Sequence, residues 1–71
     1  MHVVNPSPMA KKMIDAANSN PLKVTGTSSG GHFLVTSNVD GIVVRMKIEG
    51  GSNIKKNQHI RVNPNNLEVT A

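Results

Sequence analysis

The amino-acid sequence predicts a mainly β protein, a small five-stranded β-barrel with a short N-terminal helix. Apolar and polar residues alternate with a period of two, as half-buried strands require, most clearly over residues 42–48. Short runs of this kind recur after residue 21 and are separated by segments rich in glycine and asparagine. A barrel also removes exposed sheet edges, which favours closure in a chain this small.

The composition limits the size, stability and location of the protein. A chain of 71 residues forms one domain and buries only about 60% of its unfolded surface. It has no cysteine, so neither a disulfide nor a cysteine-based zinc cluster stabilises it, and we expect no cofactor. No segment approaches the roughly 20 apolar residues of a membrane span, and residues 1–6 lack a signal pattern. We therefore expect a soluble, cytoplasmic protein without a membrane partner.

Residues 1–20 are predicted to form an N-terminal arm with a short helix. Ser7 is suited to the N-cap and Pro8 to the first helical position. The pattern predicts that one helical face carries Met9, Met13, Ala16 and Ala17. Asn18-Ser19-Asn20-Pro21 ends the helix, because proline disfavours a helical conformation in the residue before it.

Residues 21–71 are predicted to form the barrel domain. The expected strands are residues 22–25, 32–36, 42–48, 58–62 and 67–70. Between them we expect a flexible loop at 27–31, a hairpin turn at 38–41, one helical turn at 54–57 and a second turn at 63–66. An open sheet with the helix across one face is the alternative arrangement.

The strand predicted at residues 42–48 carries basic residues on its polar side. Its inward residues are expected to be Ile42, Val44, Met46 and Ile48, and its outward residues Val43, Arg45 and Lys47. The strand at 58–62 repeats the pattern, with His59 and Arg61 outward, and Lys23 does so in the first strand. We expect Arg61 to lie beside the strand at 42–48. Since the net charge is +4, this basic face predicts a polyanion partner.

A series of short motifs runs through the last two-thirds of the chain. In order they are Val24, Phe33-Leu34-Val35, Asp40-Gly41, the strand 43–48 with Gly50, Lys55-Lys56-Asn57, Ile60-Arg61-Val62 and Leu67-Glu68-Val69. Residues 24–69 thereby resemble the oligonucleotide/oligosaccharide-binding (OB) barrel of bacterial translation initiation factor one and its archaeal and eukaryotic counterparts. The resemblance implies an OB-like barrel that binds structured RNA, typically at the small ribosomal subunit.

The basic pattern and the resemblance together predict a non-catalytic RNA-binding module. The candidate phosphate contacts are Lys23, Arg45, Lys47, Lys55, Lys56 and Arg61, and the candidate polar or stacking contacts are Asn57 and His59. Phe33 is the only aromatic residue and is expected in the core, so successive bases have no aromatic platform on which to stack. The N-terminal arm is a candidate surface for a protein partner.

Two other classes of function remain open. An assembly protein of a viral particle or another large complex would dock through the methionine-bearing helix and a sheet edge. A small ribonuclease would use His32 and His59 as acid and base beside Lys47. A metal site is not expected, because there is no cysteine and no carboxylate at ligand spacing from a histidine.

Overall fold

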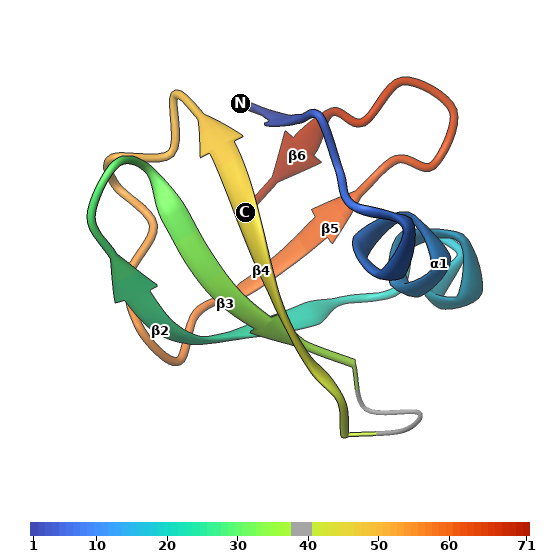
Figure 1. Cartoon of the computed structure of the whole chain (residues 1–71), viewed down its shortest axis with the longest axis horizontal. Helices are drawn as coiled ribbons and strands as arrows, with labels where there is room; N and C mark the ends of the chain where they lie inside the picture. The colour runs from blue at the N-terminus through green and yellow to red at the C-terminus, as the bar shows by residue number, and fades with distance from the viewer. Residues whose placement is uncertain (38–40) are drawn as a thin grey trace.

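The computed structural model describes residues 1–37 and 41–71 and confirms a mainly β protein with a short N-terminal helix (Figure 1). In chain order the elements are β1 (His2–Val4), α1 (Pro8–Ala17), β2 (Leu22–Ser28), β3 (His32–Thr36), β4 (Val43–Glu49), β5 (His59–Val62) and β6 (Val69–Thr70). Most predicted strands are present, but β1 was not predicted. Its three residues are too few to show a strand's alternation, so no local signal reveals it.

The described strands form one antiparallel sheet in the order β1-β4-β3-β2-β5-β6, and the predicted closed five-stranded barrel is wrong. Among the described residues, the two edge strands of the sheet meet at an isolated bridge between His2 and Glu68. There the amide of Val69 donates to the carbonyl oxygen of Met1 at 2.8 Å. The place beside β4, where the strand at 58–62 was expected, is taken by β1. The alternative of an open sheet with a helix packed against it describes the molecule better.

Helix α1 begins and ends where the sequence predicts. The Ser7 side chain accepts a hydrogen bond of 3.1 Å from the Ala10 amide, and Pro8 follows the cap. Asn18 ends the helix in the left-handed conformation at φ 50°. The predicted apolar face is confirmed at Met13 and Ala17 and wrong at Met9 and Ala16. The helix buries Ala10, Met13, Ile14 and Ala17, whereas Met9 and Ala16 are exposed.

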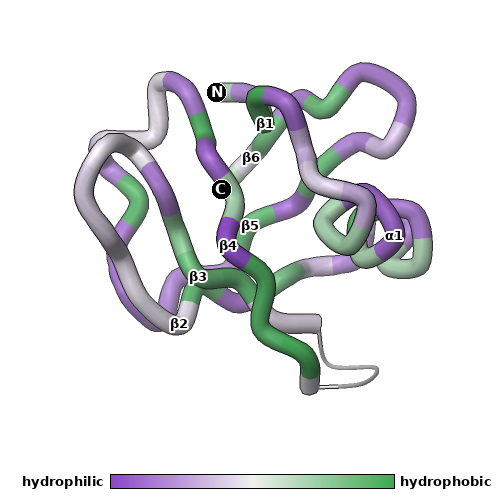
Figure 2. Tube along the Cα trace, in the orientation of Figure 1, coloured by the Kyte–Doolittle hydropathy of each residue, from purple (hydrophilic) through white to green (hydrophobic). Residues whose placement is uncertain are grey.

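The core lies between α1 and the inner face of the curled sheet. Along β4, Val44, Met46 and Ile48 are buried and the residues between them are exposed, which confirms the predicted alternation (Figure 2). Phe33 is also buried, as predicted. Ile42 is an exception, since it precedes β4 and is 44% exposed.

Strand β5 does not pair with β4. It pairs with β2 on one side and β6 on the other, so the prediction that Arg61 lies beside the strand at 42–48 is wrong. Backbone hydrogen bonds join the chain after β4 to β2. The amide of Asn57 donates to the carbonyl oxygen of Val24 at 2.7 Å, and the amide of Val24 donates to that of Gln58 at 2.9 Å. Two strands, β3 and β2, therefore separate β4 from β5.

The turns agree with the sequence prediction in part. The turn at 63–66 is confirmed, with the Leu67 amide donating to the carbonyl oxygen of Asn63 at 2.8 Å. The predicted loop at 27–31 is partly strand, because β2 extends to Ser28. Residues 54–57 form no helix but a turn, in which the Gln58 amide donates to the carbonyl oxygen of Lys55. The turn predicted at 38–41 falls almost entirely outside the described residues.

Candidate nucleic-acid interface

Strand β4 presents two cations on its outer face. Arg45 and Lys47 are both exposed, with buried Met46 between them, so both side chains leave the same side of the sheet. On the neighbouring strand β3, His32 is the Cα partner of Lys47 and Leu34 is the partner of Arg45. The antiparallel pairing therefore brings a histidine next to the two basic side chains of β4.

These three side chains share a concave surface, which we call the β4 depression. It has a volume of about 330 Å³ and is lined by Val4, Asn5, Ser7, His32, Arg45 and Lys47. None of these six lining residues is acidic. Because no carboxylate neutralises the cations within it, the depression is suited to an anion.

The sequence suggested His32 as an acid–base residue, not as a member of the basic site. Its Nδ1 lies 3.2 Å from the carbonyl oxygen of Ser29. A carbonyl oxygen only accepts hydrogen bonds, so this contact requires the proton on Nδ1 and leaves Nε2 to a ligand. The inward position of Phe33 indicates that His32 points outward. Its place opposite Lys47 depends on the register of β3 against β4, which no local pattern reveals.

Asn5 and Ser7 close one side of the depression from the segment between β1 and α1. The Ser7 oxygen accepts from Ala10, so its hydroxyl hydrogen remains available to a ligand. The first turn of α1 contains no acidic residue, and its positive dipole end adds to the charge of the cations. Neither residue was predicted as part of the site, because only the position of β1 beside β4 brings this segment there.

The other predicted basic residues of the sheet form a second group at β2 and β5. Lys23 is the Cα partner of His59, and Arg61 is the next exposed residue along β5. Leu34 and Thr36 of β3 and Thr25 of β2 occupy the outer face between this group and the β4 depression. The single basic face predicted from the sequence is therefore two separate groups.

The loop after β4 holds the remaining candidates outside both groups. Lys55 and Lys56 are exposed, and the Lys55 amide donates to Oε1 of Gln58 at 3.0 Å. Asn57 adopts a left-handed conformation at φ 72°, and its amide is used in the bond to Val24. The loop is thus fixed beside β2, and its lysines do not line the β4 depression.

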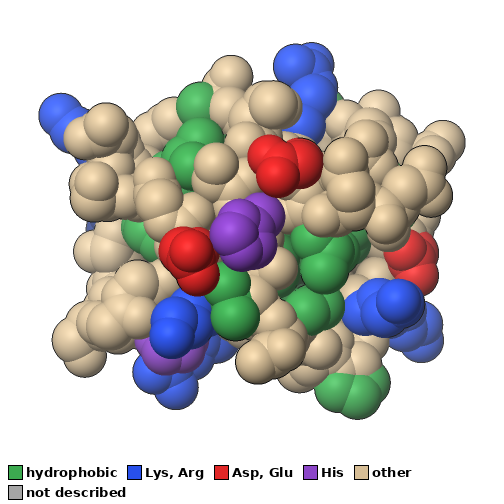
Figure 3. All heavy atoms as spheres, turned by 90° about the horizontal axis from the view of Figure 1, so that it is seen from above, with side chains coloured by type: hydrophobic (Ala, Val, Ile, Leu, Met, Phe, Trp, Pro, Cys, Tyr) green, Lys and Arg blue, Asp and Glu red, His purple; other side chains and the backbone are tan. Residues whose placement is uncertain are grey.

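Acidic side chains lie beyond the depression, at the meeting of the sheet edges. Glu49 is the next exposed residue of β4 after Lys47, and its Oε2 lies 3.9 Å from Nε2 of His2. Seen from above, a histidine lies between two acidic side chains, while the basic side chains are scattered toward the margins (Figure 3). The negative charge at this end therefore borders the basic site without entering it.

The register does not support the proposed ribonuclease pair. His32 is the partner of Ser28 near one end of β2, and His59 is the partner of Lys23 near the other. At about 3.3 Å per residue, these partners lie roughly 16 Å apart along β2. Two histidines so placed cannot act on one phosphate. Among the described residues there is also no group of three His, Cys, Asp or Glu that could hold a metal ion.

Comparison with known proteins gives no relative from which a function could be transferred. No family model, no curated protein and no solved structure matches this chain. In the part of the chain that the structure describes, no helix is long and apolar enough to span a membrane.

Proposed function

We propose that this protein is a non-catalytic RNA-binding module that holds the RNA backbone in the β4 depression. The observation that carries the proposal is the convergence of Arg45, Lys47 and His32 on one concave surface without a carboxylate. Phosphate contacts of this kind dominate the affinity of proteins for nucleic acids. Arginine and lysine neutralise the phosphate. The Nε2 atom of His32, which accepts when Nδ1 carries the proton, takes a hydrogen bond from a ribose hydroxyl.

The polar neighbours of these cations favour RNA over DNA. Asn5 and Ser7 line the same depression and offer an amide and a hydroxyl beside the phosphate position. Such groups suit the ribose 2′-hydroxyl, which is the feature that distinguishes RNA from DNA. The single aromatic residue, Phe33, is 6% exposed, so recognition rests on phosphate and ribose rather than on base stacking.

The second group gives the RNA another point of contact. Lys23 and Arg61 are the cations of this group, and His59 lies between them on the same face. An RNA strand long enough to pass the neutral residues of β3 and β2 reaches both groups. The resemblance of residues 24–69 to initiation factor one makes the small ribosomal subunit our proposed RNA partner and the cytoplasm our proposed location.

Filter-binding titrations at two salt concentrations test this function. Single-stranded RNA, duplex RNA and duplex DNA are the three ligands. We expect retention of RNA that falls steeply with salt, with a log–log slope of about 0.7 for each phosphate neutralised on a single strand. If the chain retains none of the three ligands at low salt, the proposed function is wrong.

A pair of charge-matched variants tests the site itself. Arg45→Gln combined with Lys47→Gln removes two charges from the depression, whereas Lys55→Gln combined with Lys56→Gln removes two charges from the loop beside β2. We expect the first pair to weaken RNA binding far more than the second. Equal losses would mean that net charge, not the depression, determines the affinity.

A further inference from the structure

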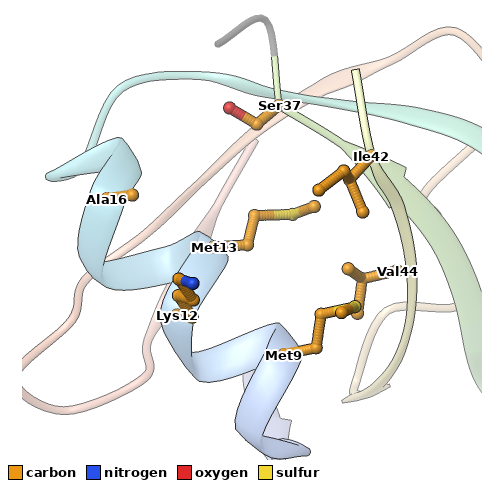
Figure 4. A pocket seen from close by; sticks show the side chains of 7 residues that line it. All are labelled: Met9, Lys12, Met13, Ala16, Ser37, Ile42 and Val44. Atoms are coloured by element: carbon orange, nitrogen blue, oxygen red, sulfur yellow. The ribbon is translucent and has the colours of Figure 1, made fainter. Parts of the chain in front are cut away.

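An apolar groove lies between helix α1 and the beginning of β4, on a different surface from the β4 depression. We call it the α1–β4 groove. It has a volume of about 120 Å³ and is lined by Met9, Lys12, Met13, Ala16, Ser37, Ile42 and Val44. The methionines of the helix point across it toward Ile42 and Val44 (Figure 4). Its size suits one apolar side chain rather than a large ligand.

Apolar side chains remain exposed around this groove. Met9 is 57% exposed, and Ile42, just before β4, is 44% exposed. These residues lie next to the buried Val44 and Met13, so the apolar surface of the core continues out to solvent here. A continuous exposed apolar surface with a polar margin is typical of an interaction site.

The same part of β4 has an edge that no described strand covers. The Ile48 amide donates to the carbonyl oxygen of Gly31 at 3.0 Å, so Ile48 turns its backbone groups toward β3. By the alternation of an antiparallel strand, Arg45 and Val43 turn theirs to the opposite edge. Strand β1 covers this edge only from Lys47 to Glu49. Within residues 1–37 and 41–71, no strand pairs with it at Val43 or Arg45.

We propose that an extended segment of a partner protein, rich in alternating acidic and apolar residues, adds to β4 along this edge. The partner residue opposite Val44 points to the same face as Val44 and places its apolar side chain in the α1–β4 groove. The residue opposite Arg45 points outward and presents a carboxylate to the guanidinium. Main-chain hydrogen bonds to Val43 and Arg45 hold the segment, and the groove selects its sequence.

Charge determines the choice of an acidic partner. The charged residue that lines the groove is Lys12, and the charged residue of the uncovered edge is Arg45. A second copy of this chain added along the same edge would bring arginine close to arginine, and like charges on paired strands are destabilising. RNA is also a poor occupant, because it has no aliphatic side chain to fill the groove.

A synthetic peptide in which glutamate and leucine alternate is the probe, labelled with fluorescein and titrated in the absence of RNA. Because RNA is absent, the outcome is independent of the proposed function. We expect the peptide to bind and to slow amide hydrogen exchange at Val43 and Arg45. A peptide of the same composition with its leucines in one block should bind at least about tenfold more weakly. Methylation of alternate backbone nitrogens should cause a similar loss, since each removes a main-chain donor.

Two matched pairs of variants link the binding to this surface. Met9→Lys should abolish peptide binding, whereas Met9→Leu should preserve it, and both changes are at an exposed position. Val43→Pro removes the backbone amide that points to the uncovered edge, without removing a hydrogen bond to β3, and should weaken peptide binding. Val43→Thr retains that amide and should preserve binding. Thermal melting of each variant establishes that the fold is intact.

Three results would overturn the proposal. One is equal binding of the alternating and the block peptides. Another is that the alternating peptide does not bind, or that it binds and leaves amide exchange at Val43 and Arg45 unchanged at saturation. The third is a concentration-dependent dimer in sedimentation that Val43→Pro abolishes, since this would assign the edge to a second copy of the chain.

Discussion

The amide of Val3 donates a hydrogen bond of 2.9 Å to the carbonyl oxygen of Leu67, joining the beginning of the chain to its end. On its other side, Val3 is the Cα partner of Ile48 in β4. One short strand therefore links β4 to the segment that leads into β6. The same strand carries Asn5 and Ser7 to the β4 depression, so the stability of the sheet and the shape of the candidate site depend on it.

Truncation of Val3 should destabilise the whole sheet. The side chain is 2% exposed, so Val3→Ala removes two buried methyl groups and should lower the free energy of unfolding by about 2 kcal/mol. Val43→Ala is the matched control, since Val43 is 51% exposed and its truncation should cost little. Urea unfolding monitored by circular dichroism measures both. Equal costs would show that β1 does not contribute to the core as described.

Substitutions at Ser7 should separate stability from RNA binding. Ser7→Ala removes the helix cap and should cost about 1 kcal/mol of unfolding free energy. Ser7→Asp retains a capping oxygen and should keep the stability close to that of the original chain. It also places a carboxylate in the β4 depression, so RNA affinity should fall. Thermal melts and filter binding on the same preparations test this, and undiminished RNA binding by Ser7→Asp would contradict the assigned site.

A side chain at Gly51 should disturb the core. A methyl group there would lie 2.9 Å from Cδ1 of Ile54 and 3.2 Å from Cε1 of Phe33, and overpacking of this kind costs about 1–3 kcal/mol. Gly26→Ala is the control, because its nearest neighbour is the flexible end of exposed Leu34 at 3.3 Å. Chemical unfolding should rank Gly51→Ala well below Gly26→Ala. The reverse order would contradict the packing of the loop after β4.

The two basic groups should contribute to RNA binding independently. Lys47→Gln and Lys23→Gln each remove one charge, and β3 and β2 separate the two positions. Each change should lower the salt slope by about 0.7, and the double variant should lose the sum of the two binding free energies. Filter binding on a long single-stranded RNA provides the measurement. Strong non-additivity would indicate that both lysines contact the same phosphate.

The sequence by itself determined the features that depend on neighbouring residues. The alternation along residues 43–48 and 59–62 determined which side chains enter the core, because successive strand residues point to opposite faces. The start of α1 was equally local, since Ser7 and Pro8 act on the first helical turn. The buried face of the helix is not determined locally, because alanine residues fit either face and the contact with β4 decides which side is buried.

Only the tertiary structure decided which strands lie side by side. Pairing of β1 with β4, and of β5 with β2 rather than β4, joins segments far apart in the chain. No window of neighbouring residues contains that information, since it arises from the packing of the whole core. These pairings place Lys47 opposite His32, bring Asn5 and Ser7 to the same depression, and move Arg61 to another group. The sequence thus determined that the outer face is basic, and the strand order determined how its charges are divided.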